Sequence, residues 1–304
     1  MTLLIGSLQL GLLYAVMVLG IYVSFRILNI PDLTTEGSFT LGLAVSCCFT
    51  LLGHPFLGIA AGTGAGALSG SFTGFLQTKL GIHPVLAGIL TMSGLYSINM
   101  MVLGGAPNVS LIGKNTVFTI AAAAIPSLNK EMAKLFIALA AALSCTLFLS
   151  LFFATRLGLC IRAAGDNEDM VRASSINADC TRMIALALSN GLIALCGALI
   201  AQYQSFGDIN SGSSMLVVGL ASVIIGEVFL GRHSLNRGFP SVILGSVIYR
   251  YIIAAATRAD WFPAYMLKLS SAFIVLLALA LPAIKKHIES HTIKQGGKNH
   301  GSYA

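Results

Sequence analysis

The chain has 304 residues, of which 56% are hydrophobic and only 10% are charged, and its mean hydropathy is +0.86. Soluble domains carry roughly 25% charged residues, so this composition excludes an ordinary water-soluble protein and indicates one that spans a membrane. The net charge of +7 does not indicate a nucleic-acid partner, because the basic residues follow the ends of apolar runs or lie in residues 285–304. That distribution is the one expected of the cytoplasmic side of a membrane protein.

Long stretches without a charged residue cover most of the chain. They are residues 1–25, 37–78, 84–113, 135–155, 183–207, 209–226 and 269–284. A helix of about 20 residues crosses the hydrocarbon core, and the stretch 37–78 is long enough to cross twice. We therefore predict an all-α, polytopic membrane helix bundle of about eight to ten transmembrane helices. Residues 1–284 form the membrane domain, and the basic residues 285–304 are expected to be a disordered cytoplasmic tail that could also contact anionic lipid.

Glycine recurs at every fourth position along the second half of the 37–78 stretch. These glycines are Gly58, Gly62, Gly66, Gly70 and Gly74. On a helix they trace a groove that admits a neighbouring backbone. Two interpretations remain open: close packing in the bundle, or a surface that slides during gating.

The segment NIPDLTTEGS, residues 29–38, is unusually polar for its surroundings. Pro31 donates no backbone hydrogen bond and disfavours helix at Ile30, so a helix is expected to break or begin here. The segment is either a loop at the membrane edge or the base of a translocation path, since ionisable groups in membranes line water or pair. A second polar patch follows near residues 202–213 and is expected at the outer mouth of the same path. The candidate path residues are Asp32, Thr34, Thr35, Glu36, Ser38, Asp208, Asn210 and Ser213.

Two further charges, Glu227 and Arg250, lie in or beside apolar runs and are not expected to meet. Extension of their side chains to the membrane interface is one interpretation, and a role in gating is the other. The sequence contains no G-x-x-x-x-G-K-[ST] phosphate loop, no H-E-x-x-H and no G-x-S-x-G. Its six cysteines form no C-x-x-C pair. We therefore expect no enzymatic activity, no metal site and no cofactor in this chain.

Residues 156–182 hold an isolated concentration of charge between two apolar runs. Asp166 can cap a short helix that ends near residues 175–177, and Asn177 or Asp179 can cap the next membrane helix. This loop is either an ordinary solvated loop or a short amphipathic helix that binds a groove in a partner protein. The candidate coupling residues are Arg162, Asp166, Asn167, Met170, Arg172, Ala173, Ser174, Ile176 and Asn177.

A resemblance favours the second interpretation. The sequences TRLGLCIRAAGDN (155–167) and ASSIN (173–177) resemble the cytoplasmic coupling loop of the branched-chain amino acid and sugar permease family of bacterial ATP-binding cassette (ABC) importers. NIPDLTTEGSFTLG (29–42) is similar to a P-D-L-T-x-[DE]-G-S-F block in one subgroup of that family. The segments 223–227, 238–240 and 244–250 continue the likeness. The E-A-A-x-x-x-G signature of other importers is not matched.

The resemblance implies a homodimeric permease in the bacterial inner membrane, in which the coupling loop inserts into a separate ATPase. ATP and Mg²⁺ are then expected on that ATPase, and an extracytoplasmic substrate-binding protein is expected to deliver the solute. The subgroup resembles tryptophan and tyrosine uptake systems, so the solute is expected to be an aromatic or branched-chain amino acid. A sugar or nucleoside permease and an ion-coupled secondary transporter remain alternatives.

Overall fold

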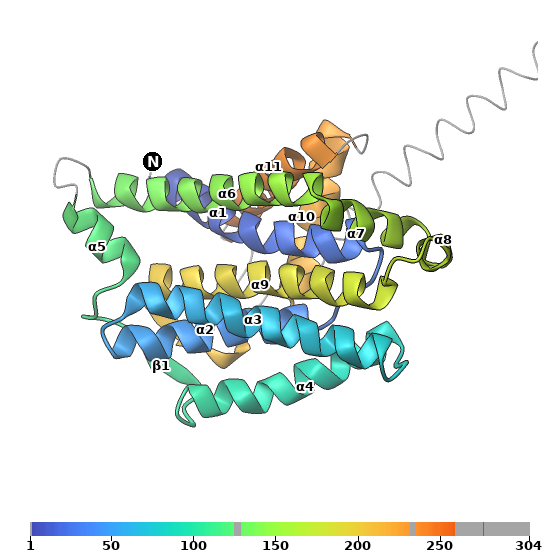
Figure 1. Ribbon diagram of the computed structural model, residues 1–304. Coiled ribbons are helices and arrows are strands. Elements are labelled where there is room, and N and C mark those ends of the chain that lie inside the picture. The colour runs from blue at the N-terminus through green and yellow to red at the C-terminus, as the bar shows by residue number, and fades with distance from the viewer. Residues whose placement is uncertain (1, 125–128, 232–234, 259–275, 277–304) are drawn as a thin grey trace, which may run out of the picture.

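The computed structural model describes residues 2–124, 129–231, 235–258 and 276, and it shows a bundle of helices with one small strand pair (Figure 1). The helices that precede the coupling region are α1 (Thr2–Tyr22), its π-helical continuation η1 (Val23–Ile27), α2 (Thr35–Leu51), α3 (Pro55–Thr78), α4 (Pro84–Val102), α5 (Val117–Ala124) and α6 (Lys130–Ala154). The rest are α7 (Arg156–Asp166), α8 (Glu168–Ala173), α9 (Ala178–Gln204), the 3-10 turn η2 (Ile209–Gly212), α10 (Met215–Leu230) and α11 (Leu235–Arg258). Strands β1 (Asn108–Ser110) and β2 (Phe206–Asp208) pair antiparallel.

The described part of the chain has six segments that are long and apolar enough to cross a membrane. They are Leu4–Ile27, Pro84–Val102, Lys130–Ala154, Ala178–Gln204, Ile209–Leu230 and Arg237–Ala256. The long uncharged stretch 37–78 divides into two helices, α2 and α3, at a turn where Gly53 has a positive φ of 88°. The predicted all-α, polytopic architecture is therefore confirmed. The last predicted span (269–284) and the tail (285–304) lie outside the described residues, apart from residue 276.

Helix α9 lies at the centre of the bundle, where α1, α2 and α3 pack against it. The glycine groove of α3 makes several of the close approaches to α9. A Cβ added at Gly66 would overlap Ala194, one added at Gly70 would overlap the carbonyl oxygen of Leu186, and one added at Gly74 would lie 2.9 Å from Cα of Met183. Gly62 and Gly58 lie on the same face of α3 and pack against α2. The groove is thus a packing surface, as the first of the two interpretations predicts.

The two ends of the bundle differ. One end, here called the α5 end, carries α5, the β1–β2 pair and the start of α1, whereas the α8 end carries α7 and α8 (Figure 1). At the α5 end, Tyr203 donates a hydrogen bond to Oε1 of Gln9 at 2.6 Å. The segment between η1 and α2 does not stay at the α8 end, because Asp32 meets Asn190 halfway along α9. Helix α2 therefore begins inside the bundle and runs toward the α5 end.

Glu227 and Arg250 each contact a different residue. A carboxylate oxygen of Glu227, near the end of α10, lies 2.5 Å from a guanidinium nitrogen of Arg26 in η1. The guanidinium of Arg250 lies 3.8 Å from the ring centroid of Tyr14 on α1, within the range of a cation–π contact. The ion pair ties η1 to α10, so Glu227 takes part in an intramolecular contact that the sequence did not indicate.

Candidate functional site

A buried carboxylate lies at the point where α2 begins. Asp32 is 2% exposed, its Oδ2 accepts a hydrogen bond from Nδ2 of Asn190 at 2.6 Å, and its Oδ1 accepts one from the backbone N–H of Thr34 at 2.9 Å. The hydroxyl of Thr35 donates to the carbonyl oxygen of Asp32 at 2.9 Å. A carboxylate is costly to bury without such partners. These contacts account for the break predicted at Pro31 and hold the start of α2 against α9.

Hydroxyl groups extend this polar cluster toward α3 and α4. Oγ1 of Thr34 lies 2.9 Å from that of Thr73, which donates to Oγ1 of Thr91 at 3.1 Å. Oγ of Ser38 lies 2.8 Å from that of Ser69. Thr34, Thr35 and Ser38 are fully buried. In this conformation they hold helices together, and their place on the translocation path stays a prediction.

A cavity of about 370 Å³ lies beside this cluster, toward the α5 end. Its lining residues are Glu36, Gly37, Thr40, Met92, Ser93, Tyr96, Asn99, Ile209, Gly212 and Ser213. The two polar patches of the sequence, near Glu36 and Ser213, thus border one opening. They are joined where the backbone N–H of Ser214 donates to Oε1 of Glu36 at 2.8 Å. Gly212 permits this approach, because a Cβ there would overlap the carbonyl oxygen of Glu36.

Asp208 and Asn210 lie next to this cavity but are not among its lining residues. Oδ1 of Asp208 accepts the backbone N–H of Asn210 at 2.7 Å and so caps η2, and Asp208 also pairs with Asn108 in the strand pair. Asp208 thus has a structural role here, and the place of both residues on the path stays a prediction. Sequence analysis missed Asn99, which donates from Nδ2 to the carbonyl oxygen of Gly37 at 3.2 Å. A lone asparagine within an apolar run was the available signal.

The charged loop 156–182 forms two short helices, α7 and α8. The N-terminal caps are side chains of Thr155 for α7, Asn167 for α8 and Asn177 for α9, with Asn167 and Asn177 each accepting a backbone N–H at 3.0 Å. The cap predicted at Asn177 is confirmed. The cap predicted at Asp166 is wrong, because Asp166 is the last residue of α7 and the chain turns there before α8 begins.

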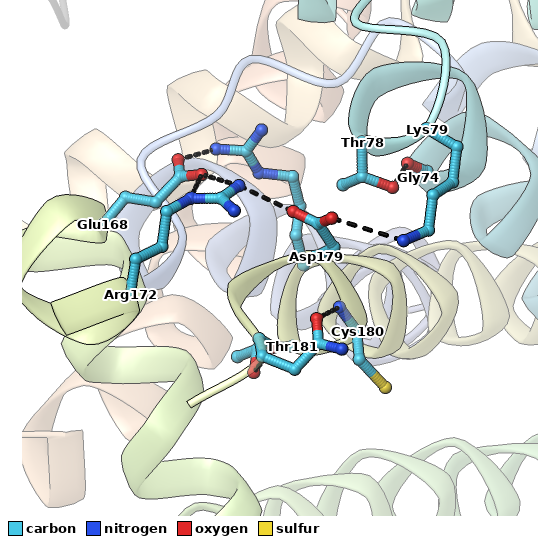
Figure 2. A network of polar contacts seen from close by, with 10 residues as sticks. Gly74, Thr78, Lys79, Glu168, Arg172, Asp179, Cys180 and Thr181 are labelled. Carbon is cyan, nitrogen blue, oxygen red and sulfur yellow. Dashed lines mark hydrogen bonds and ion pairs between the residues drawn. The ribbon is translucent and has the colours of Figure 1, made fainter. Parts of the chain in front are cut away.

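Ion pairs fix α8 to the bundle (Figure 2). Arg172 contacts Oε1 of Glu168 at 2.8 Å and Oδ1 of Asp179 at 2.6 Å, Asp179 also lies 3.4 Å from Nζ of Lys79, and Glu168 also pairs with Arg182. Hydrogen bonds to Glu168 and Asp179 raise the pKa of Arg172. Exposed pairs contribute little singly, but this network joins α8, α9 and the end of α3. Arg172, a predicted coupling residue, is therefore held by contacts within this chain.

The other predicted coupling residues present an outward face at the α8 end. Met170 is 55% exposed. Arg162, Asp166, Ala173 and Ser174 are also exposed, whereas Ile176 is partly buried. Val171 is the side chain of α8 that packs inward. The face around Met170 is thus available to another protein, while the ion pairs on the other side hold α8 in place.

Helix α7 touches the segment that leads to Asp32. Nδ2 of Asn29 donates to the carbonyl oxygen of Gly165 at 3.0 Å. The backbones approach so closely that a Cβ added at Gly165 would overlap the carbonyl oxygen of Ile27. Asn29 itself has a positive φ of 54°, a conformation that asparagine tolerates better than most residues. Helix α7 therefore contacts the segment that leads into the polar cluster.

Comparison with known proteins agrees with this geometry. A family model described as the permease component of branched-chain amino acid transport systems matches residues 3–281. The tyrosine transport system permease protein of Clostridioides difficile (strain R20291) is 34% identical over 272 residues, which are 89% of this chain and 88% of that protein. An uncharacterized protein of Rickettsia prowazekii (strain Madrid E) is 36% identical over 76% of this chain and 80% of its own length.

A more distant relative belongs to another transport system. The autoinducer 2 import system permease protein LsrC of Yersinia enterocolitica is 28% identical over 214 residues, covering 70% of this chain and 52% of that protein. No solved structure matches the chain.

Proposed function

Because the chain belongs to the family of permease components of branched-chain amino acid transport systems, we propose that it imports an amino acid with an aromatic or branched side chain, driven by a separate ABC ATPase. The chain is a multi-pass protein of the bacterial inner membrane and a transport permease. Its partners in this proposal are the ATPase, which holds ATP and Mg²⁺, an extracytoplasmic substrate-binding protein, and a second copy of the chain.

The contact between Asn29 and Gly165 carries the proposal. A permease powered by a separate ATPase needs a surface that binds the ATPase. It also needs a rigid connection from that surface to the translocation path. The exposed face of α8 around Met170 supplies the surface, and the Asn29 contact connects α7 to the segment that holds Asp32. Hinges and packed helices transmit small displacements in this way.

Similarity to a tyrosine permease supports an amino acid as the solute. The weaker similarity to LsrC supports a sugar-like solute as the second candidate. A secondary transporter would need a carboxylate placed to bind the coupling ion. Asp32 is the deeply buried carboxylate among the described residues, and its oxygens accept hydrogen bonds from Asn190 and Thr34, which supports a structural role for it.

Copurification tests the proposal. The tagged full chain is extracted from its native membranes in mild detergent, and we expect an ABC ATPase to elute with it in fixed ratio and to hydrolyse ATP. Met170→Asp, which places a charge on the exposed face of α8, should lose the ATPase while the permease still elutes in a single symmetric peak, as a folded protein does. Purification without any ATPase, together with amino acid uptake driven by an ion gradient in proteoliposomes, would refute the proposal.

A further inference from the structure

Another cavity, of about 470 Å³, lies at the α5 end of the bundle between α5, the start of α6 and the end of α9. Phe118 and Tyr203 give it an aromatic wall, and Lys130, Glu131 and Lys134 give it a charged side. Its volume falls in the range of small-molecule sites, roughly 300–1,000 Å³. The proposed transport function makes no use of this cavity, so its ligand follows from its own chemistry.

Contacts between helices hold the walls of this cavity in place. The ring of Phe118 meets that of Tyr203 edge-on, with the ring centroids 5.5 Å apart. The hydroxyl of Tyr203 donates to Oε1 of Gln9 at 2.6 Å, and Nε2 of Gln9 donates to the carbonyl oxygen of Glu131 at 2.7 Å. These contacts link α5, α9, α1 and α6 in turn. The cavity is therefore formed by the fold itself, before any ligand enters.

The charged side of the cavity carries an excess of positive charge. Glu131 is already compensated, because Nζ of Lys134 lies 3.3 Å from its Oε1 and Nε2 of Gln9 donates to its Oε2 at 3.3 Å. Lys134 also lies 5.5 Å from the ring centroid of Tyr203, a cation–π contact. Lys130 is exposed and forms no ion pair with any residue that the structure describes. Two ammonium groups and one carboxylate leave one positive charge, which attracts an anion.

The length of α6 places Lys130 and Lys134 at the surface of the bilayer. Residues 135–154 of this helix are uncharged, and at a rise of 1.5 Å per residue they span about 30 Å, the thickness of the hydrocarbon core. Phe136 and Leu147 of this helix are more than half exposed, as side chains that contact lipid are. The two lysines then lie at the depth of the headgroups, where phospholipid phosphates are the abundant anions.

We propose that this cavity binds the headgroup of an anionic phospholipid, with Lys130 contacting its phosphate and its acyl chains lying along the exposed face of α6. A zwitterionic lipid fits less well, because the unpaired lysine repels the cationic group of its headgroup. Aromatic rings such as those of Phe118 and Tyr203 suit the boundary between headgroups and acyl chains. The proposal depends only on the place of the chain in a membrane, and not on the solute or the ATPase.

Native mass spectrometry of the purified full chain tests the site. The delipidated protein in mild detergent is titrated with phosphatidylglycerol and, separately, with phosphatidylcholine that has the same acyl chains. We expect phosphatidylglycerol to bind about fivefold more tightly, which is the contribution of one lysine near a membrane surface. Inorganic phosphate should not displace the lipid, because it lacks the acyl chains that lie along α6.

Substitutions of Lys130 test its role directly. Lys130→Gln should remove the preference for phosphatidylglycerol, whereas Lys130→Arg should retain it. Both change an exposed side chain, so the fold is expected to survive. Lys114→Gln is the matched control, because Lys114 is also exposed, lies between β1 and α5, and is not part of the cavity lining.

Photocrosslinking in intact cells identifies the ligand without removing a charge. A benzophenone amino acid in place of Ala123, an exposed residue of the cavity wall, should give a phospholipid adduct of the chain. A protein adduct instead would show that the cavity receives a partner protein and would overturn the proposal. Equal binding of the two lipids, an unchanged preference in Lys130→Gln, or displacement by inorganic phosphate would overturn it as well.

Discussion

Asn29 donates a hydrogen bond to the carbonyl oxygen of Gly165 at 3.0 Å, and the two residues are 136 positions apart in the sequence. Gly165 lies at the end of α7, one residue before the chain turns into α8, and Asn29 lies three residues before the buried Asp32. In the proposed complex, a displacement of α7 and α8 by a bound ATPase would therefore reach the start of α2 through this contact. Such a transmission requires no relay of side chains between the two regions.

Gly165→Val should break this connection, because its side chain would overlap the backbone at Ile27. We expect tyrosine uptake to fall at least about tenfold, as misplaced elements distant from a site commonly cause, while the ATPase still copurifies. Uptake assays in cells combined with copurification measure both effects. Gly64→Val is the matched control, since a Cβ at Gly64 has no neighbour within 4 Å. Normal uptake by Gly165→Val would contradict the assigned connection.

Met170 and Arg172 lie on the same short helix but should behave differently. Met170→Asp changes an exposed side chain and should abolish ATPase binding without altering backbone hydrogen exchange. Arg172→Glu opposes Glu168 and Asp179, and should increase hydrogen exchange in α8 and the first turn of α9. Mass spectrometry of exchange distinguishes the two. Equal protection of α8 in both variants would show that the ion pairs do not fix it.

Gly66→Leu and Gly70→Leu should destabilise the bundle, because each side chain meets α9 at contact distance. Overpacking of a tight interface costs about 1–3 kcal/mol or more, so thermal unfolding in detergent should occur at lower temperature in both variants. Gly64→Leu, on an open face of α3, serves as the control. Unchanged unfolding with selective loss of uptake would favour a sliding surface instead.

Much of this fold is predictable from the sequence because membrane spanning requires long uncharged helices. The runs 84–113, 135–155 and 183–207 correspond to α4, α6 and α9, and the glycine spacing of α3 indicates a tight interface. The sequence predicts Asp166 as the N-terminal cap of α8, whereas the structure has Asn167 there. Both residue types are good caps, and the position at which α7 ends determines which of the two caps α8.

The interior polar contacts were not predictable. Asn190 and Thr73 lie within largely apolar helices, and nothing local shows that they face Asp32 and Thr34. The pairing of Arg26 with Glu227 joins residues 201 positions apart. Such partners depend on which helices become neighbours, which a single sequence does not specify.

Cysteine accessibility separates the buried cluster from the cavity rim. In a variant without the native cysteines, Asn210→Cys and Ser213→Cys should react with a water-soluble maleimide, because both positions are exposed. Thr35→Cys and Ser38→Cys should be protected, since these positions are fully buried, and should become reactive only with the ATPase and ATP. Rapid labelling of Ser38→Cys without nucleotide would place it on an open path.

Transport by the reconstituted complex tests the central claim most directly. The chain is placed in proteoliposomes with its copurified ATPase and binding protein, and labelled tyrosine is followed across the membrane with ATP on the ATPase side. The account predicts uptake that requires ATP and is lost in Met170→Asp. Tyrosine transport that proceeds equally without ATP, or that Met170→Asp leaves unchanged, would contradict it.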